Sequence, residues 1–343
     1  MKILCVGDVH WSQNSSIVRS RGTNYSVRLE NLIRSVNWAE VVALDNGCDV
    51  IVYLGDFFDS SQLNSEEVSA LREVKWSYLP HIFITGNHET TTHSLEYSTS
   101  DIFNLCSNAV VVNKPSYYHV EGTDVEFAFL PYILERDRQP LDTYFPTKTE
   151  KRIIFSHNDL KDVQYGQFLS TEGFTLDEIH SHCDLFMNGH IHNCSYVTDK
   201  IINCGNLTGQ NFTEDATKYG HFVEIIDTSN MSVQFICNPH ALNFAKIDAT
   251  GDKFVNAFPI KFNNPVLTIK VDSPEYARAA REYCDFSGNV VSYRVVIESK
   301  TTENIESFTS IESIDHLKQF EQYVLTSIGN TSVIREELQN VMR

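Results

Sequence analysis

The sequence predicts a layered α/β sandwich, and three observations support this prediction. Short runs rich in Ile, Val and Phe recur along the first 240 residues, each closed by glycine or a polar residue, as is typical of strands covered on both faces. Segments with apolar residues at helical spacing alternate with these runs. Hairpin-like pairs of runs are added to the alternation, and a layered sandwich accommodates them better than a simple doubly wound sheet does.

The composition predicts a cytoplasmic protein with room for more than one core. The chain has 343 residues, of which 42% are hydrophobic, enough for one large core or for a core and a smaller domain. No signal peptide is recognisable near the N-terminus and no apolar run approaches the roughly 20 residues that span a membrane, so no membrane contact is expected. The eight cysteines include no CxxC pair, which favours reduced core thiols over a structural zinc site.

Helices and strands alternate along the chain in the order that this class requires. A helix at about 25–45 has its apolar residues on one face. A second helix starts after Asn64 or Ser65, with two glutamates suited to its N-terminus, and runs to about residue 78. The further elements expected in the core are a helix at 99–106, a strand at 109–112, a hairpin at 116–131, and two strands within 199–206 and 221–227.

A change of pattern near residue 240 predicts three parts. Residues 1–240 would form the catalytic domain. Residues 241–300 contain a strand, a helix and a second strand, enough for a small α/β domain that caps the first. Residues 301–343 would form a linker and a helical tail, because their apolar residues lie in two stripes that are separated at Gly329 and Asn330.

Side chains that bind metals stand where five of the apolar runs end. The five runs and their ends are KILCVGDVH, DVIVYLGDFFD, HIFITGNHE, RIIFSHND and DLFMNGHIH. Ligands of open α/β sheets bind outside the carboxyl ends of the strands, so we expect these side chains to surround one pocket. The residues concerned are Asp8, His10, Asp56, Asp59, Asn87, His88, His157, His190 and His192.

Such a set of side chains predicts a centre with two metal ions. Asp, Asn and His supply oxygen and nitrogen ligands, which suit Mn, Fe or Zn better than a thiolate metal or an all-oxygen calcium site. Six or seven candidates are too many for one ion. Two ions about 3.5–4 Å apart, bridged by one carboxylate, would use them all and would permit an in-line displacement at phosphorus. Asp56 is the expected bridge, because it follows a central strand between the two groups of ligands.

In this order and spacing, the motifs GDVH, GDFFD, GNHE, SH and GHIH resemble the motif set of the calcineurin-like metallophosphoesterases. The resemblance implies a four-layer α/β/β/α sandwich and two divalent ions, with manganese expected first and magnesium, iron and zinc as alternatives. The ligands that it implies are Asp8, His10, Asp56 and His192 for one ion, and Asp56, Asn87, His157 and His190 for the other.

Two further residues match catalytic positions of this family. His88 matches the histidine that protonates the leaving oxygen, and Asp59 matches the residue that orients it. Histidine can perform this step near neutral pH when a carboxylate holds its ring. Glu89 stands where many relatives have Asp, which matters little if this side chain does not contact the metals.

Within the superfamily, the chain is most similar to the SbcD-type nuclease, the catalytic subunit of the Mre/Rad break-repair complexes, and especially to its short phage forms. The similarity rests on GDFFD followed by a helix and GNHE, on INCGN soon after GHIH, and on the small domain and tail; GDVHWSQ departs from the usual GD-x-H-L-G. It implies a DNA exonuclease and endonuclease that hydrolyses phosphodiesters with a metal-bridging hydroxide, in DNA repair and recombination, in the host cytoplasm if a phage encodes it.

The same similarity implies two protein partners. An SbcC/Rad-type ATPase would bind the C-terminal helices at 312–343. A second copy of the chain would bind through the helices at 65–78 and 99–106, although the apolar residues Leu71, Val74 and Trp76 could instead pack on the sheet.

The net charge of −18 opposes a nucleic-acid partner, but its distribution is uneven. Residues 241–300 have seven acidic and eight basic residues, and Arg19 and Arg21 lie in the loop just after two predicted ligands. We expect both regions to face the phosphate backbone of double-stranded DNA.

Two other functions remain open. A stand-alone metallophosphoesterase acting on nucleotides or phosphoproteins would use the same site. A catalytically silent scaffold would keep the fold alone, but the intact ligand set disfavours it.

Overall fold

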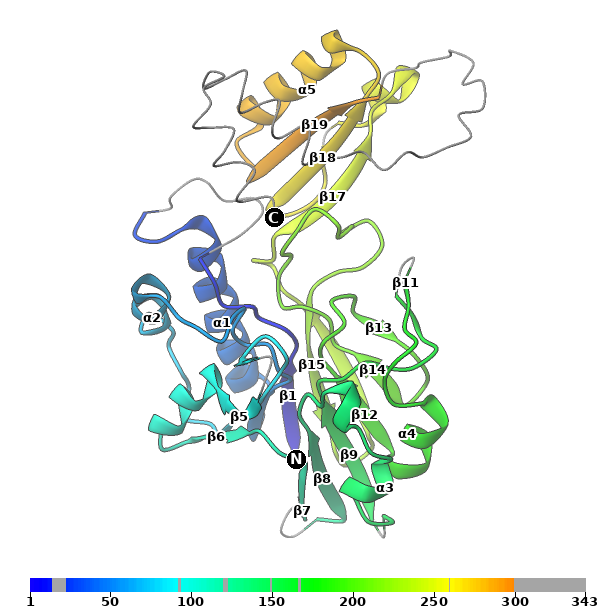
Figure 1. Cartoon of the computed structure of the whole chain (residues 1–343). Coiled ribbons are helices and arrows are strands. Elements are labelled where there is room, and N and C mark those ends of the chain that lie inside the picture. The colour runs from blue at the N-terminus through cyan, green and yellow to red at the C-terminus, as the bar shows by residue number, and fades with distance from the viewer. Residues whose placement is uncertain are drawn as a thin grey trace, which may run out of the picture. The chain divides into compact units, whose positions relative to one another are not determined.

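The computed structural model divides the chain into two units, Met1–Glu298 and Ser299–Arg343 (Figure 1). The described residues are 1–13, 23–91, 94–119, 123–148, 150–165, 168–258 and 260–298. The predictions for Arg19 and Arg21 and for the helical tail at 301–343 therefore lie outside the described residues.

Two six-stranded sheets face each other in the first unit. One has the order β16 (Ser232–Cys237), β15 (Phe222–Asp227), β1 (Lys2–Val6), β2 (Val50–Tyr53), β3 (His81–Ile84), β6 (Ala109–Val112). The other has the order β13 (Ser195–Tyr196), β14 (Ile201–Asn203), β12 (Leu185–Asn188), β9 (Lys151–Ser156), β8 (Val125–Leu130), β7 (Ser116–His119). Their inner faces share one apolar core. Strands β1, β2, β3 and β6 are mutually parallel, and so are β14, β12, β9 and β8.

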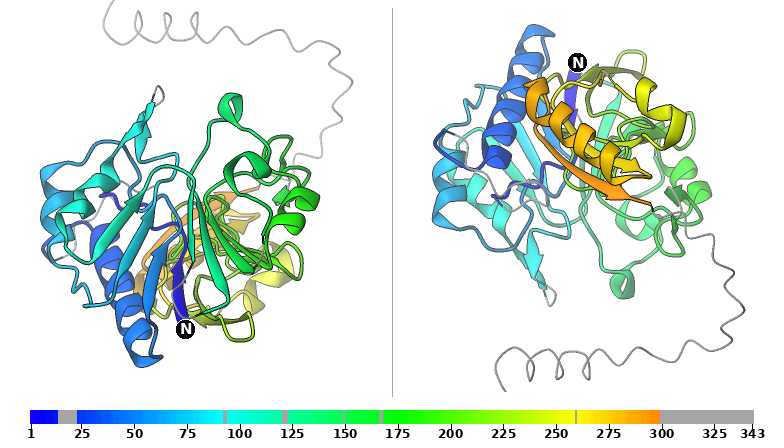
Figure 2. Two further views of the ribbon diagram at one scale, coloured as in Figure 1. Left: turned by 90° about the horizontal axis from the view of Figure 1, so that it is seen from below. Right: turned by 90° about the horizontal axis from the view of Figure 1, so that it is seen from above.

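Helices cover the outer face of each sheet (Figure 2). Helices α1 (Val27–Asp45), α2 (Ser65–Leu71) and η1 (Thr99–Leu105) pack on the first sheet, and α3 (Leu141–Tyr144) and α4 (Leu176–His182) on the second. The side chain of Ser26 caps α1, and a capping box between Asn64 and Glu67 starts α2. The predicted α/β/β/α sandwich is therefore confirmed.

Shorter elements complete this part of the chain. They are β4 (Thr90–Thr91), β5 (Ser94–Ser98), η2 (Glu135–Asp137), β10 (Gln164–Tyr165) and β11 (Phe168–Leu169). Among the residues that the structure describes, no helix is long and apolar enough to cross a membrane.

Helix α2 is shorter than the sequence predicts, since it ends at Leu71 and not near residue 78. The next amides bond to carbonyls three residues back, with Val74 N donating to Leu71 O, so the chain leaves the helix in tight turns. These turns bring Val74 and Trp76 into the core beneath α1. The side chains that motivated a dimer thus pack on the sheet, and the homodimer stays a prediction.

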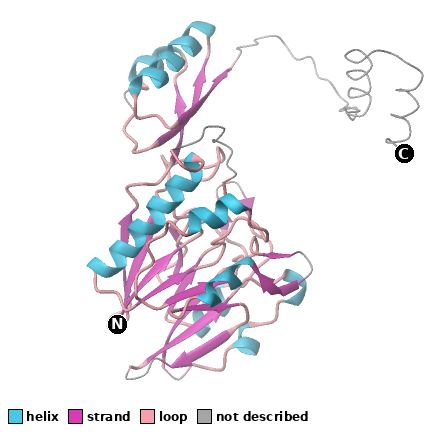
Figure 3. Cartoon of the chain, turned by 90° about the vertical axis from the view of Figure 1, so that its left-hand side faces the viewer, coloured by secondary structure: helices cyan, strands magenta, loops and turns pink. Residues whose placement is uncertain are grey.

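Residues 241–298 build a small sheet with its own apolar core. Strands β17 (Asn243–Asp248), β18 (Pro265–Val271) and β19 (Ser292–Ile297) are parallel, and η3 (Gly251–Asn256) follows β17. Helix α5 (Pro274–Ser287) lies across one face of the strands (Figure 3). The strand, helix and strand expected here are present, and β17 is an additional strand that the sequence did not reveal.

One carboxyl group is buried in the first sheet without a full set of partners. Glu224 of β15 is fully buried, and its Oε1 accepts a long contact of 3.9 Å from the Cys194 thiol. Within the described part of the chain, no hydrogen bond reaches its Oε2. Burial raises the pKa of Glu224 to about 8.

The raised pKa predicts a stability that falls with pH. The folded state holds the Glu224 proton more tightly than the unfolded chain does, so stability is lost as the pH rises from about 4.5 through about 8. Replacing Glu224 by Gln should remove this loss. At pH 9 the free energy of unfolding should rise by on the order of 1.4 kcal/mol for each unit by which the pKa differs between the folded and unfolded states. Urea unfolding at pH 5 and pH 9 measures it, with the exposed Glu275→Gln as the control. An unchanged pH dependence in Glu224→Gln would contradict it.

Candidate metal centre

The carboxyl ends of five parallel strands bring the seven predicted ligands to one place. Asp8 and His10 follow β1, Asp56 follows β2, Asn87 follows β3, His157 follows β9, and His190 and His192 follow β12. The acidic and histidine side chains among them, together with His88, form three overlapping groups, and within each group the ligand atoms lie within 4.8 Å of one another; His88 belongs to the group with His10 and Asp56. The role of these residues as ligands stays a prediction, but their convergence is a feature of the fold.

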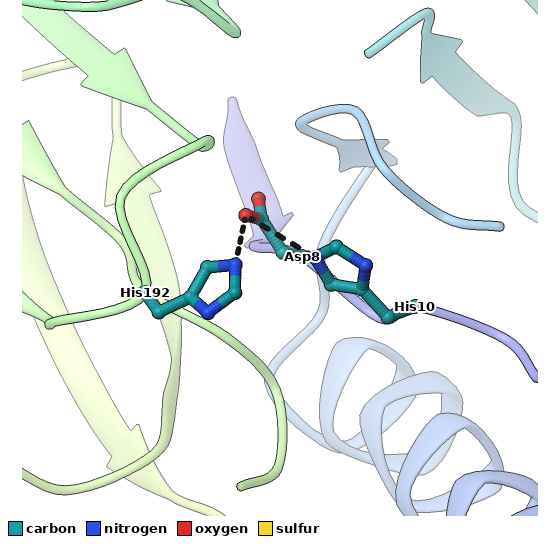
Figure 4. A group of neighbouring side chains, drawn as sticks. All are labelled: Asp8, His10 and His192. Carbon is teal, nitrogen blue, oxygen red and sulfur yellow. Dashed lines mark ion pairs between the residues drawn. The ribbon is translucent and has the colours of Figure 1, made fainter. Parts of the chain in front are cut away.

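The first group consists of Asp8, His10 and His192 (Figure 4). The Asp8 Oδ2 atom is 3.7 Å from His192 Nε2 and 3.9 Å from His10 Nε2. Asp8 and His10 are buried, yet Asp8 Oδ2 and His10 Nε2 find no hydrogen-bond partner among the described residues. Buried polar atoms normally have partners. Two such atoms, directed at one point with a third ligand beside them, fit a cation.

The second group consists of Asp56, Asn87, His157 and His190. The Asp56 Oδ2 atom is 3.2 Å from His157 Nε2. The Asn87 Oδ1 atom is 3.1 Å from His157 Nε2 and 3.0 Å from His190 Nδ1. Asp56 Oδ2 also lies 3.8 Å from His10 Nε2, so this carboxylate stands between the two groups, where a bridging ligand is needed.

Hydrogen bonds on the far side of each ring select the nitrogen that faces the centre. His157 Nδ1 donates to Leu54 O at 2.7 Å, which leaves Nε2 as the ring nitrogen that faces Asp56. His190 is held the other way round, because its Nε2 lies 3.3 Å from the Asp159 carboxylate and its Nδ1 faces Asn87. Sequence reasoning missed Asp159, although it ends the same motif, RIIFSHND, that contains His157.

Three of the predicted ligands have a strained backbone. His10, Asp56 and His190 have positive φ angles of 49°, 46° and 69°, a conformation that costs on the order of 1–3 kcal/mol for each residue. Main-chain bonds hold it in place, since the Asp56 carbonyl accepts from Val9 N at 3.1 Å and from His10 N at 2.9 Å. A Cβ atom at Gly86 would overlap Asp56, which explains the glycine before Asn87.

The electrostatic environment favours positive charge. Burial opposes protonation of His10, but the carboxylates of Asp59, Asp8 and Asp56 outweigh it and raise its pKa to about 10. Burial likewise opposes protonation of His157, but the carboxylates of Asp56 and Asp8 raise its pKa to about 9. The pKa of Asp56 is lowered in spite of its burial, chiefly by His157. Divalent ions that bind here would displace the protons from these rings.

Asp59 contacts both His10 and His88, and its role in orienting His88 stays a prediction. Its carboxylate accepts from His10 Nδ1 at 2.9 Å, which leaves His10 Nε2 for a metal. His88 Nδ1 donates to the main-chain carbonyl of Asp59 at 3.1 Å, whereas the Asp59 carboxylate is 3.7 Å away. The carboxylate thus pairs with the more deeply buried ring. His88 is 42% exposed, as a residue that meets a leaving group requires.

Glu89 joins the two loops that follow β2 and β3. It is fully buried and accepts hydrogen bonds from Phe58 N, Gly86 N and Ser100 Oγ at 3.2, 2.7 and 2.7 Å. Burial and the charge of Asp56 raise its pKa to about 7. Its three partners show that this side chain supports the ligand loops.

A sequence model of the calcineurin-like phosphoesterases matches residues 1–219, so the chain belongs to this family. Members of the family are hydrolases that bind two divalent metals, and the residues present fit that pair. Bound there, the ions would supply an activated water molecule and polarise the phosphoryl group. A search among curated proteins found no match.

The solved structures that match the chain have low sequence identity. A dimetal phosphatase from Danio rerio is 14% identical, with 69% of this chain and 99% of that chain covered at a TM-score of 0.42. The protein TT1561 from Thermus thermophilus is 12% identical, with 69% and 98% covered at 0.41. The NAD nucleotidase of Haemophilus influenzae is 12% identical, with 83% and 60% covered at 0.33. The assignment to the family therefore rests on the sequence match over residues 1–219.

Removal of His88 and removal of Asp56 should have different consequences. His88→Ala should abolish turnover and leave metal binding nearly intact, because its ring lies beside the ligands and is held by Asp59 O. Asp56→Ala should reduce both, because its carboxylate faces both groups. Calorimetric titration with Mn²⁺ and a turnover assay separate them, with the exposed His119→Ala as the control. Loss of metal from His88→Ala would make His88 a ligand.

Asp159→Asn should weaken metal binding about 10- to 100-fold, because a neutral amide no longer fixes the ring of His190. Mn²⁺ calorimetry measures the affinity, and ¹⁵N chemical shifts of His190 report which ring nitrogen is protonated in the metal-free protein. Asp162→Asn, an exposed neighbour, is the matched control. Unchanged affinity and an unchanged tautomer would show that Asp159 does not position His190.

Proposed function

We propose that the protein is a metal-dependent DNA nuclease of the SbcD type. It hydrolyses phosphodiesters of double-stranded DNA as an exonuclease and endonuclease, with manganese as the metal, and works with an SbcC/Rad-type ATPase in DNA repair and recombination. The observation that supports this function over a small-molecule phosphatase is the direct connection between the metal centre and the small sheet of residues 241–298.

The loop at 205–216 makes that connection. One end of the loop bonds to the main chain of Asp8 on both sides. Asp8 N donates to Gly205 O at 3.1 Å, and Asp8 O accepts from Leu207 N at 2.8 Å. Further along, Gly209 N donates to Leu242 O at 3.1 Å, just before β17. A ligand of the candidate centre and the small sheet are therefore held by the same loop.

An aromatic contact strengthens the far end of this loop. The Phe212 ring lies 5.3 Å from the Phe244 ring of β17, and the guanidinium of Arg294 from β19 lies 4.3 Å above the Phe212 ring. A small phosphate ester has no evident need for the additional three-stranded sheet that the loop connects to the candidate metal centre. A polymer that extends past the reacting phosphate could contact this sheet, which favours DNA as the substrate.

The charge distribution is consistent with contacts to the DNA backbone. Residues 241–300 lack the acidic excess of the chain as a whole. Arg19 and Arg21 are proposed to add to these contacts from the loop after His10. Contacts of this kind give salt-sensitive binding without sequence preference.

Protein partners belong to the same proposal. Residues 312–343 would dock on the ATPase through the apolar stripes that their sequence predicts, as amphipathic helices do in a groove. A homodimer would place two active sites on one DNA molecule.

An assay of two substrates tests the proposed function. End-labelled linear duplex DNA and bis(p-nitrophenyl) phosphate are incubated with the protein and either Mn²⁺ or Mg²⁺. We expect hydrolysis of both substrates with Mn²⁺, and Asp56→Ala controls for contaminating nucleases. If the chromogenic diester is hydrolysed while duplex DNA stays intact, the protein is a stand-alone phosphoesterase.

The same assay tests the partner when the ATPase and ATP are added. Deletion of residues 312–343 should spare hydrolysis of the chromogenic diester and abolish the ATP-stimulated degradation of long duplexes. A truncated chain that loses its melting transition would show that these residues belong to the catalytic fold.

A further inference from the structure

A cavity of about 310 Å³ lies next to the metal centre, behind Tyr132. Its walls come from β5, the loop between β6 and β7, the loop after β8, η2 and helix α3. Tyr132 lines the cavity, and the centroid of its ring is 6.0 Å from that of the predicted ligand His190. The same residue therefore borders the cavity and approaches the candidate centre.

The position of Tyr132 is fixed from both sides. Its N donates to Thr85 O at 2.9 Å, directly after β3. The next amide, Ile133 N, donates to the side chain of the buried Asn158 at 3.1 Å, and Asn158 adjoins His157. The cavity and the centre thus share a rigid frame, which is the condition for a subsite that acts together with a reacting group.

The lining of the cavity suits a planar aromatic group. Tyr132 and Tyr144 supply rings, and Pro131 and Ile133 supply a buried apolar wall. Charged side chains of both signs are also present, namely the cations Lys114 and Arg136 and the acids Glu96 and Asp137, and all four are exposed. Rings stack on any base, so such a site binds bases without reading the sequence.

The size of the cavity also limits its occupant. A volume of about 310 Å³ is at the lower end of the range for small-molecule sites. That volume has room for one nucleoside. A base that enters must first leave its stack, which costs least at an unpaired or mispaired end.

We infer that this cavity holds the nucleobase next to the phosphodiester that is cleaved. Tyr132 stacks on that base, and the enzyme acts fastest on a nucleotide that is unpaired. The inference rests on the proposed function, because it names the form of DNA that the same site takes.

Small phosphodiesters with and without a base test the inference. The substrates are thymidine 5′- and 3′-(p-nitrophenyl phosphate), and methyl p-nitrophenyl phosphate, which has the same leaving group and no base. The wild-type protein should have the higher kcat/KM for at least one thymidine ester. Tyr132→Leu should lower the ratio of that kcat/KM to the value for the methyl ester by about fivefold or more, as expected for loss of base stacking.

Two variants serve as controls. Tyr132→Phe keeps the ring and should keep most of the ratio. Tyr78→Leu removes an exposed tyrosine before β3, at the opposite end of that strand from the ligands, and should leave the ratio unchanged. Mn²⁺ calorimetry and thermal melting of Tyr132→Leu show whether the protein is folded and binds metal.

The outcomes distinguish the subsite from the nuclease. A ratio near one in the wild type, or one that Tyr132→Leu does not alter, overturns the subsite even if duplex DNA is cleaved. Thymidine esters that are preferred and depend on Tyr132, with duplex DNA left intact, support the subsite and overturn the nuclease. Faster cleavage of duplexes with an unpaired terminal nucleotide supports both.

Discussion

The carboxylates of Asp8 and Asp56 are buried where the carboxyl ends of the parallel strands of both sheets meet. The rest of the candidate centre depends on this burial. A buried charge costs several kcal/mol unless other groups compensate for it. One oxygen of each carboxylate is compensated by a main-chain amide, with His190 N at 2.9 Å from Asp8 Oδ1 and His88 N at 2.9 Å from Asp56 Oδ1. The other oxygens, both Oδ2, face histidine nitrogens across the space where cations would lie.

These bonds also connect the two sheets. Asp8 belongs to the first sheet, whereas His190 follows a strand of the second; His157 of the second sheet donates to Leu54 O of the first. The candidate centre therefore lies on a cross-link between the sheets, and the strained φ angles of its ligands persist because bonds from both sides fix them. Ligands held in this way are positioned before any ion binds.

Parallel-strand geometry explains why much of this could be predicted from sequence. The apolar runs locate β1, β2, β3, β9 and β12, and once their carboxyl ends are known to meet, the residues that follow them must converge. Details that depend on competition between neighbours could not be predicted. The pairing of the Asp59 carboxylate with His10, the hold of Asp159 on His190, and the early end of α2 are each decided by contacts distant in sequence or by packing.

Specificity depends on the surroundings of the centre, because any phosphate ester can meet the same metals. Two features of this chain narrow the choice: the loop at 205–216 ties the centre to the small sheet, and Tyr132, which approaches the centre, borders a cavity of nucleoside size. Neither feature contributes a predicted metal ligand. Both features would therefore act on the choice of substrate and not on the chemistry.

Anomalous diffraction at the manganese edge, from crystals grown with Mn²⁺, tests the central claim most directly. The account predicts two peaks about 3.5–4 Å apart, with Asp56 in contact with both. Asp8, His10 and His192 should surround one peak, and Asn87, His157 and His190 the other. A single peak, or two peaks of which one lies away from these residues, would contradict a dinuclear centre built from the five strand ends.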